Sequence, residues 1–468
     1  MKSLLFPALL LSSTCLADSN WPQFRGDGGL GLGSGKPPVE FSAEKNLKWK
    51  VEVPLGHSSP CIWGDKVALT GLDGGKLVTF CLSRTDGHEL WRVAVPTEKI
   101  ENAHRIGSPA APTCCTDGER VISYFGSYGV LAYDWSGKEL WKKPLPAPVV
   151  EFGTSASPVI ADGKVIIVAD QDIGSYMIAL DVKTGAEVWK VDRTEFRRGF
   201  SSPFIWKHDG IEELIVCGSL WTRSYDLKDG KQRWSVRGMA RVSNASPIAA
   251  DGVLLLVSWN VGGDEDDRVL MEPHDVFLAA NDADKDGLLT LEEFPKSKIK
   301  DRYSQIDANK DGKVTKEEYE VLRGMFADAV NQLFAIKPGG SGDITDTHVV
   351  WQQSKHLPYV SSPVVANGRV FTMKSGGLAS AYDAQNGSPI YQAERVDASG
   401  DYYASAVTAD GRIYLVSQRG TVVVLDAKSE TLNVLARNEL KAPVFASPAI
   451  LDGVIYVRTD KHLMAFGM

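Results

Sequence analysis

The sequence predicts an all-β fold, an eight-bladed β-propeller whose two chain ends share one blade and whose fifth blade carries a small α-helical insertion. Three observations predict it: a motif that recurs along the chain, a serine-containing mark that precedes each copy, and two acidic loops that interrupt the series. The copies are spaced by roughly 42 to 49 residues and hold short runs of strand-forming residues, which is typical of propeller blades.

The recurring motif is clearest at residues 179–189, which read Ala-Leu-Asp-Val-Lys-Thr-Gly-Ala-Glu-Val-Trp. One strand ends, Gly185 allows a turn with positive φ, and the next strand carries Trp189, which can dock on a neighbouring repeat. A single unit cannot bury its own apolar face, so the motif predicts an array. Copies that end in an aromatic ring four residues after a glycine lie at residues 81–91, 132–141, 224–234 and 381–391. A weaker copy at residues 425–427 lacks both the glycine and the aromatic ring.

A second mark, Ser-x-Pro or a variant, introduces each repeat and is followed by a short strand and a turn. The strand runs are β-branched or aromatic, as in residues 165–168 and 414–416, and lack the 3.6-residue period of helices. Eight marks predict eight blades. They are Ser58-Ser59-Pro60, Gly107-Ser108-Pro109, Ala156-Ser157-Pro158, Ser201-Ser202-Pro203, Ala245-Ser246-Pro247, Ser361-Ser362-Pro363, Ala404-Ser405-Ala406 and Ala446-Ser447-Pro448.

The last repeat is incomplete, because it ends at Met468 after strands predicted near residues 454–458 and 463–466. Residues 47–51 at the other end of the chain supply a strand with the missing tryptophan, Trp49. We therefore expect the ring to close by pairing the two ends in one blade, which removes a free sheet edge. The propeller is expected to span residues 47–260 and 331–468.

Residues 1–17 match a secretory signal peptide, with Lys2, an apolar run over residues 4–11 and Cys15-Leu16-Ala17 before the cleavage point. A lipid anchor on Cys15 is the weaker alternative, because the usual apolar residue three positions upstream is missing. No other apolar run approaches the roughly 18 residues of a membrane helix. The sequence thus predicts an exported protein, periplasmic or extracellular, without a transmembrane segment.

Composition and motifs argue against several classes of function. The balance of 51 basic and 59 acidic residues does not favour nucleic-acid binding. Gly26, Gly28 and Gly31 match a dinucleotide fingerprint, but no strand precedes them and no helix follows, so residues 18–46 are predicted to be an extended segment laid on the propeller. Hydrolase motifs such as Gly-x-Ser-x-Gly are absent from the sequence.

The repeats, the opening Trp21-Pro22-Gln23-Phe24-Arg25-Gly26 and the terminal closure resemble the pyrroloquinoline-quinone-type (PQQ-like) β-propeller family of secreted bacterial proteins. The resemblance implies eight four-stranded blades with aromatic rings docked between them. It implies less about function, because the family mixes quinoprotein dehydrogenases with cofactor-free relatives, including the propeller subunit of the outer-membrane barrel-assembly machinery.

Quinoprotein alcohol dehydrogenases in this family carry a disulfide between adjacent cysteines near their cofactor. Here Cys114 and Cys115 are adjacent, but they lie between Pro112 and the turn at residues 116–118, where other blades have plain strand or turn residues. Five cysteines remain after cleavage, an odd number and too few for a disulfide scaffold. The pair is therefore predicted to be two half-buried thiols.

Two loops between the strands of blade five, residues 282–293 and 307–318, match the twelve-residue EF-hand pattern. Ca²⁺ takes about six to eight oxygen ligands, and the pattern supplies them in turn. Leu289 and Val314 stand at the eighth positions, where paired loops join in a short β-bridge. The predicted ligands of two Ca²⁺ ions are Asp282, Asp284, Asp286, Leu288 (carbonyl), Thr290 and Glu293 in the first loop, and Asp307, Asn309, Asp311, Lys313 (carbonyl), Thr315 and Glu318 in the second.

The insertion, residues 261–330, is predicted to fold as a small lobe, with helices over residues 273–281 and 317–331 and a short connector over residues 292–306. It holds eighteen acidic and ten basic residues, an excess of eight negative charges that equals the formal charge of the whole chain, −8. The short connector favours a structural or weakly sensing calcium module. The predicted core of the lobe is Phe277, Phe294, Tyr303, Ile306, Tyr319, Leu322 and Phe326.

Strands alternate in direction within a blade, so the lobe is expected to project beside the mouth of the central funnel. Residues just before each mark should line that mouth, and their basic and aromatic character suits an anionic or sugar-like ligand. The candidate lining residues are His57, Arg105, Phe152, Arg198, Arg241, Tyr359, Tyr402 and Phe445, with His104, Arg197 and Tyr403 beside them.

Three functions compete. The sequence favours a secreted calcium-binding propeller that acts as a binding or scaffold protein at the cell envelope, with an unknown small-molecule, glycan or protein ligand at the funnel. The first alternative is a PQQ-dependent alcohol or aldose dehydrogenase, which needs a stacking Trp, a chelating Glu or Asn and a catalytic Asp. Those positions, and any catalytic residue, cannot be assigned from the sequence. The further alternative is an outer-membrane assembly factor.

Overall fold

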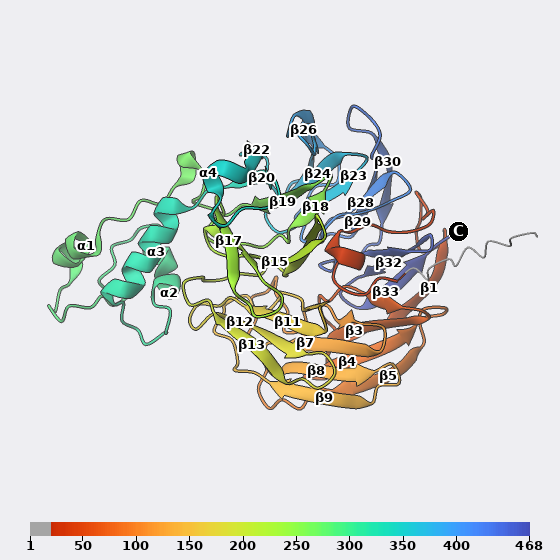
Figure 1. The fold of residues 1–468 in the computed structure, drawn as a ribbon, viewed down its shortest axis with the longest axis horizontal. Coiled ribbons are helices and arrows are strands. Elements are labelled where there is room, and N and C mark those ends of the chain that lie inside the picture. Colours follow the sequence, from red (N-terminus) through yellow and green to blue (C-terminus); the bar gives the residue numbers. More distant parts are fainter. Residues whose placement is uncertain (1–19) are drawn as a thin grey trace, which may run out of the picture.

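The computed structural model describes residues 20–468, and the predicted signal peptide lies outside them. Eight antiparallel sheets are arranged in a ring, and a helical lobe projects from one side of it (Figure 1). The predicted eight-bladed propeller with a small helical insertion is thereby confirmed. None of the helices among the described residues is long and apolar enough to cross a membrane.

The first four blades follow one another in the chain, each from the inner strand to the outer one. They consist of β2 (Cys61–Trp63), β3 (Lys66–Asp73), β4 (Lys76–Ser83) and β5 (Glu89–Ala94); β6 (Cys115–Thr116), β7 (Arg120–Phe125), β8 (Gly129–Asp134) and β9 (Glu139–Pro144); β10 (Val159–Ala161), β11 (Lys164–Ala169), β12 (Tyr176–Asp181) and β13 (Glu187–Asp192); and β14 (Phe204–His208), β15 (Ile211–Cys217), β16 (Trp221–Tyr225) and β17 (Gln232–Arg237).

The other four blades include the interrupted one and the one that closes the ring. They consist of β18 (Ile248–Ala250), β19 (Val253–Ser258), β20 (Gln332–Ile336) and β22 (Val349–Gln353); β23 (Val364–Ala366), β24 (Arg369–Lys374), β25 (Leu378–Asp383) and β26 (Pro389–Arg395); β27 (Val407–Ala409), β28 (Arg412–Val416), β29 (Thr421–Asp426) and β30 (Val434–Glu439); and β31 (Ala449–Leu451), β32 (Val454–Arg458), β33 (His462–Phe466) and β1 (Leu47–Glu52). Because β1 pairs antiparallel with β33, the predicted closure by the two chain ends is confirmed.

The recurring motif is a contact between blades. Trp141, at the end of one copy, packs on Gly185 of the next, and a Cβ on that glycine would lie 2.5 Å from the indole ring. Its Nε1 donates to the Val182 carbonyl oxygen over 3.0 Å. Glycine is required twice here, because φ is +72° and because the ring leaves no room for a side chain. The same ring-on-glycine contact occurs for Trp49 and Gly87, Trp91 and Gly137, Trp189 and Gly230, and Trp351 and Gly387.

The junction between blades four and five is built differently. Trp234 donates its Nε1 to Glu213 within its own blade over 2.8 Å, instead of reaching the next blade. A short strand, β21 (Gly342–Asp343), pairs in parallel with β17 beside helix α4 (Thr345–His348). At this junction, backbone pairing with β21 therefore stands in place of a tryptophan ring packed on a glycine.

The serine marks form a belt of hydrogen bonds around the central channel. At seven blade junctions, the hydroxyl just before the inner strand accepts the backbone N–H of its counterpart in the preceding blade, over 2.8 to 3.2 Å. At the last junction, buried Arg458 donates to the Ser58 carbonyl and hydroxyl oxygens. The belt residues are Ser59, Thr113, Ser157, Ser202, Ser246, Ser362, Ser405 and Ser447.

The belt corrects one predicted mark. In blade two it passes through Thr113, and Cys114 stands where six of the other seven blades have proline, so the mark expected at Gly107-Ser108-Pro109 lies too early in the chain. Cys114 and Cys115 are fully buried free thiols, more enclosed than the half-buried positions that the sequence predicted. Burial raises the pKa of Cys114 to about 12, so this thiol is protonated at neutral pH.

The segment ahead of β1 crosses one face of the ring. Trp21 forms a β-bridge with Ile62 of blade one, and Leu32 bridges Thr408 of blade seven. Between them, the 3-10 helix η1 (Asp27–Gly29) lies over the middle of the ring, where it is coloured red in Figure 1. The segment adds no blade, and its Phe24 lines the same pocket as the hydroxyl belt.

The lobe leaves blade five after β19 and returns at β20. A pair of hydrogen bonds closes its neck, because Asn331 accepts from the Asn260 backbone N–H over 2.8 Å and donates to its carbonyl over 3.0 Å. All seven predicted core residues lie in one apolar cluster of the lobe. The elements are η2 (Glu265–Asp267), α1 (His274–Asn281), η3 (Lys300–Arg302), α2 (Tyr303–Ile306) and α3 (Lys316–Asp328).

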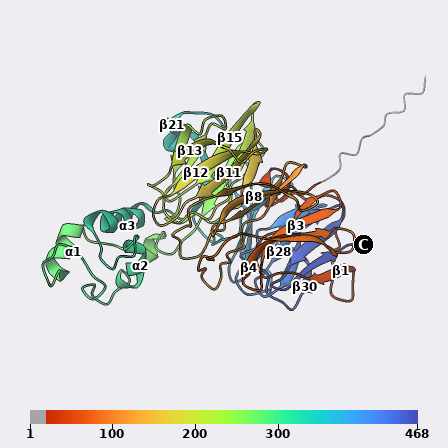
Figure 2. The same ribbon diagram turned by 90° about the horizontal axis from the view of Figure 1, so that it is seen from below.

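Helix α3 ends three residues earlier than the sequence predicts. Ala329 is extended, with ψ 136°, and the Val330 N–H donates to the Met239 carbonyl of the ring over 3.2 Å. The chain therefore leaves the helix in order to rejoin the propeller. Figure 2 shows the lobe standing away from the blades, with α1 farthest from the ring.

Candidate functional site

The first acidic loop of the lobe brings three predicted calcium ligands together. Oxygen atoms of Asp282, Asp284 and Glu293 lie within 4.8 Å of one another. Glu293 is oriented by the loop backbone, since it accepts from Thr290 N over 2.8 Å and from Ala283 N over 2.9 Å, and these hydrogen bonds lower its pKa. The Lys313 ammonium, 2.8 Å from Asp286, lowers the pKa of that carboxyl.

The second loop has the same internal plan and lies closer to the ring. Glu318 accepts from Thr315 N over 3.0 Å and from Ala308 N over 3.1 Å. Asp307 is 5% exposed, and its Oδ1 is buried without a protein partner. An unpaired buried carboxylate oxygen is costly, so the donor set of this loop fits a hard cation such as Ca²⁺.

The two loops are joined as the EF-hand pattern predicts. Leu289 and Val314 form an isolated antiparallel bridge, with N···O distances of 3.2 and 2.8 Å. Gly287 adopts φ +82°, and a Cβ added there would meet no atom within 4 Å, so the loop needs glycine for its turn alone. The inserted EF-hand pair is thus present as a folded unit.

A pocket of about 350 Å³ opens at the funnel, and the lobe contributes to its wall. Its floor is the hydroxyl belt. Its walls include the stacked rings of His57 and Phe445, 4.3 Å apart, and Tyr403, whose ring stacks on Phe445 at 5.6 Å. Burial, followed by the charge of Arg458, lowers the pKa of His57 to about 4, so this imidazole is neutral at pH 7.

Most of the predicted mouth residues reach this pocket, and some do not. Tyr402 turns into its blade, where it is 1% exposed and donates its hydroxyl to the Ala398 carbonyl over 2.7 Å. Arg105 is exposed, and neither it nor His104 nor Arg197 lines the pocket. The pocket wall does include His57, Phe152, Arg198, Arg241, Tyr359, Tyr403 and Phe445.

Sequence reasoning missed several lining residues. Arg302 and Gln305 come from the lobe, and nothing local in the sequence shows that this part of the lobe turns toward the channel. Phe24 comes from the N-terminal segment. Phe200 directly precedes a serine mark, so the rule that found Phe152 also pointed to it.

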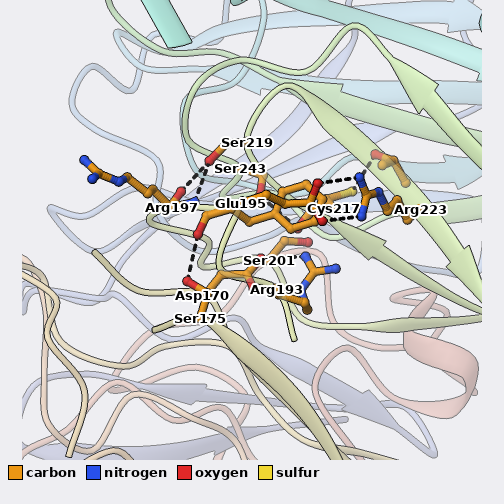
Figure 3. A network of polar contacts seen from close by, with 12 residues as sticks. Asp170, Ser175, Arg193, Glu195, Arg197, Ser201, Cys217, Ser219, Arg223 and Ser243 are labelled. Atoms are coloured by element: carbon orange, nitrogen blue, oxygen red, sulfur yellow. Dashed lines mark hydrogen bonds and ion pairs between the residues drawn. The ribbon is translucent and has the colours of Figure 1, made fainter. Parts of the chain in front are cut away.

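The loop between β13 and β14, which carries Arg197 and Arg198, is held rigidly. Arg193 is fully buried and forms a double ion pair with Asp170, with N···O distances of 2.6 and 2.8 Å. Burial alone lowers the pKa of Arg193, but the charge of Asp170 raises it above its usual value. Ser175 donates to the Phe196 carbonyl over 2.7 Å, and Ser219 accepts from Arg197 N over 3.1 Å (Figure 3).

Comparison with known families agrees with this architecture. The family model described as "Outer membrane protein assembly factor BamB" matches residues 74–259 and 397–467, more than half of the chain. The chain therefore belongs to this family of PQQ-type repeat propellers. A second model, described as "EF hand", matches residues 299–322, which contain the second acidic loop.

Two curated relatives carry the same description, outer membrane protein assembly factor BamB. The protein of Burkholderia pseudomallei is 25% identical over 203 residues, which cover 42% of this chain and 48% of the relative. That of Alkalilimnicola ehrlichii is 28% identical over 142 residues, 30% of this chain and 33% of the relative. The alignments therefore span less than half of each relative.

Solved structures share the fold at low sequence identity. BamB from Moraxella catarrhalis has a TM-score of 0.57 at 12% identity, covering 90% of this chain and 98% of that one. A europium-containing methanol dehydrogenase reaches 0.62 at 10% identity, covering 96% and 98%. The quinohemoprotein alcohol dehydrogenase of Comamonas testosteroni scores 0.56 at 12% identity, covering 96% and 81%. Enzymes and assembly factors thus share this ring.

Proposed function

We propose that the protein is an exported calcium-binding propeller that acts as a binding or scaffold protein at the cell envelope. It holds two Ca²⁺ ions in the lobe and a ligand in the funnel. The observation that carries the proposal is the funnel pocket, a space of about 350 Å³ with rings on its walls and hydrogen-bond donors on its floor and rim. Its size and mixed lining suit a small molecule or a projecting group of a larger partner.

Calcium binding is supported by both loops on separate grounds. The first gathers three carboxylates, and the second matches the EF-hand model and contains the unpaired Asp307 oxygen. The ligands proposed are those that the loop pattern assigns. An affinity of about 10⁻⁴–10⁻³ M suffices for an extracellular calcium module.

Calorimetric titration with Ca²⁺ tests this part of the proposal. Two binding events are expected for the natural chain, and none for Asp282→Ala combined with Asp307→Ala. The β-rich circular dichroism of the ring should survive in that variant. Asp328→Ala, which removes an exposed carboxylate at the end of α3, is the matched control and should retain both sites. Loss of the ring spectrum in the double variant would refute a separate calcium module.

Location at the envelope rests on the signal sequence and on the family, whose members are named for the outer membrane. Export predicts a mature protein that begins at Asp18. Cell fractionation with N-terminal sequencing checks this expectation, and an uncleaved cytoplasmic product would contradict it.

A PQQ-dependent dehydrogenase is a second candidate because two of the similar folds are alcohol dehydrogenases. The funnel residues match the requirements of that cofactor only in part, and this favours the binding protein over the enzyme. Among the described residues that line the pocket, Asn244 and Asn260 offer amide oxygens and His57 a neutral imidazole, but there is no Asp, Glu or Trp to act as a carboxylate base, a carboxylate chelator or a stacking indole. Turnover of alcohols or aldoses in a dye-linked assay with added PQQ and Ca²⁺ would overturn this conclusion.

The third candidate is an assembly factor for outer-membrane proteins, which the family match favours. The matched segments exclude the lobe. Expression in a bacterium that lacks its own factor is a direct test, and rescue of outer-membrane protein levels by a chain without residues 261–330 would support this role over ligand binding.

A further inference from the structure

Three arginines converge on one side of the funnel pocket, and they differ in how their charge is balanced. Arg198 forms ion pairs with Asp172 and Glu151, at 2.5 and 2.9 Å. Arg241 is 6% exposed, yet among the described residues it pairs with no carboxylate. Its Nη1 donates to the amide oxygen of Gln305 over 3.1 Å, and its Nε has no protein partner. The Nε of Arg302 is likewise buried without a partner.

Arg241 and Arg302, which form no ion pair among the described residues, both lie over one aromatic ring of the lobe. Arg241 lies 4.9 Å and Arg302 5.4 Å from the centre of the Phe326 ring. Burial, and then the charges of Arg302 and Arg198, lower the pKa of Arg241 to about 9. Cation–π contacts offset part of this cost for both groups. Arg302 is only half-buried and also feels the charges of Asp301 and Asp267, so the cost of a buried cation without an anion falls mainly on Arg241.

The rest of the pocket also favours an anion. Every belt hydroxyl except that of Ser59 accepts a backbone N–H, and within residues 20–468 none of the eight donates to a protein acceptor. Their protons are therefore available to a ligand. Guanidinium and hydroxyl donors, without a carboxylate in the lining, match the oxygens of phosphate, sulfate or carboxylate.

The lobe side of the pocket is continuous with the second calcium loop. Gln305 lies in α2, which ends directly before Asp307, and Asp307 N donates to the Tyr303 carbonyl over 2.9 Å. Arg197 of the ring donates to the Gln305 carbonyl over 3.3 Å. Asp307, the first predicted Ca²⁺ ligand of the loop, thus caps the C-terminal end of α2. This short helix carries Gln305 and follows directly after Arg302.

We propose that Arg241, Arg302 and the hydroxyl belt form a binding site for a small molecule that bears an oxyanion on a ring, and that calcium in the second loop strengthens this binding by fixing α2. The rings of Phe445 and Tyr403 supply a stacking surface for the ligand's ring. The inference rests on the proposed function, because it names the ligand class and the regulation of the same funnel pocket.

Phenyl phosphate is the probe for the site, and phenol is its neutral isostere. In calorimetry with the full mature chain and Ca²⁺, phenyl phosphate is expected to bind at least tenfold more tightly than phenol. Phenyl sulfate and benzoate distinguish the three oxyanions. Equal affinities for phenol and phenyl phosphate would overturn the proposal.

Substitutions locate the site. Arg241→Gln and Arg302→Gln should each weaken phenyl phosphate binding about tenfold, which corresponds to losing one charge-assisted contact. Arg302→Lys should retain part of the affinity. Arg105→Gln is the control, because that arginine is exposed near the mouth but does not line the pocket. Circular dichroism and Ca²⁺ titration verify that each variant folds. An unchanged affinity in folded Arg241→Gln would refute the assignment.

The calcium dependence has its own test. Removing Ca²⁺ should weaken phenyl phosphate binding by about fivefold or more, and phenyl phosphate should tighten Ca²⁺ binding by the same factor, since linkage is reciprocal. Asp307→Ala should lower the affinity to the calcium-free value and abolish its response to Ca²⁺. Asp282→Ala, in the loop after α1 and away from the ring, should reduce the response less. If the natural chain binds phenyl phosphate equally well with and without Ca²⁺, the proposed coupling is wrong.

The outcomes also separate this inference from the proposed function. Calcium binding with tight binding of phenol or a neutral sugar at the pocket would leave the proposed function standing and refute the oxyanion site. Calcium binding with no ligand among these probes would also refute the oxyanion site. A chain that binds neither Ca²⁺ nor any probe would refute both.

Discussion

In the ring, Trp141 of one blade covers Gly185 of the next, and the contact is repeated at other blade junctions. In the lobe, Gly287 serves a similar turn with open space around it, and the carboxylates of the loop point at one another. The ring is therefore stabilised by close packing between neighbours, whereas the lobe has a small apolar core and a set of charges that a metal ion would balance. The two regions should respond differently to mutation, metal and pH.

The largest effect is expected from breaking the buried ion pair of the ring. Asp170→Ala leaves the guanidinium of Arg193 buried and unpaired, which should lower the free energy of unfolding by about 3–5 kcal/mol. Urea denaturation followed by far-UV circular dichroism measures it, and the loss should be the same with and without Ca²⁺. Asp229→Ala, which breaks the exposed pair with Lys231, should cost less than about 1 kcal/mol.

The glycines test the packing difference directly. Gly185→Ala combines a positive φ with a clash against Trp141, so we expect a loss of about 2–4 kcal/mol in the stability of the ring. Gly163→Ala, at φ +68° in open space, is the matched control and should cost about 1–2 kcal/mol. Gly287→Ala should weaken Ca²⁺ binding and leave the melting of the ring unchanged. Equal losses of stability for Gly185→Ala and Gly163→Ala would contradict the claim that Trp141 leaves no room for a side chain at Gly185.

Calcium withdrawal should loosen the lobe and leave the folding stability of the ring unchanged. At a Ca²⁺ concentration about 100 times the dissociation constant, each site stabilises the folded lobe by about 2.7 kcal/mol. Chelation should therefore remove hydrogen-exchange protection from α1 and α3, while the inner strands of the blades keep theirs. Loss of protection throughout the ring would show that the two regions unfold as one.

The smallest expected effect concerns pH, and its sign differs between the regions. Burial raises the pKa of Glu101, in the ring, from 4.5 to about 7. Its stabilising contribution is complete below about pH 4.5 and is lost as pH rises through about 7, on the order of 2 kcal/mol. Glu101→Gln should flatten this slope in urea midpoints measured at pH 5 and 8, and Glu119→Gln, at an exposed carboxylate, should not. In the lobe the pKa values of Asp286 and Glu293 are lowered, so their contribution is lost as pH falls.

Much of the molecule was predictable because its signals are local. The glycine and tryptophan of the motif are four residues apart, and the twelve positions of an EF-hand loop are consecutive, so blades, loops and the Leu289–Val314 bridge followed from spacing alone. The mark in blade two was misplaced because Cys114 takes the place of proline, and only the hydrogen bonds of the belt identify Thr113 as the counterpart of serine.

The pocket was predictable only in part. A rule based on position before each mark found Arg198, Arg241 and Phe445, but it also selected Tyr402, whose side chain turns into the blade. Alternation along a short, irregular segment does not fix which side chain faces the channel. The rule found no residue of the lobe, since Arg302 and Gln305 are far from any mark in the sequence.

By itself the sequence determined the number of blades, their closure and the two loops with an EF-hand pattern, because periodic and consecutive residues encode them. The tertiary structure decided which arginines share a pocket and which of them have a carboxylate partner. Those are contacts between segments distant in the chain, such as Arg241 with Gln305, and they depend on the angle at which the lobe docks on the ring.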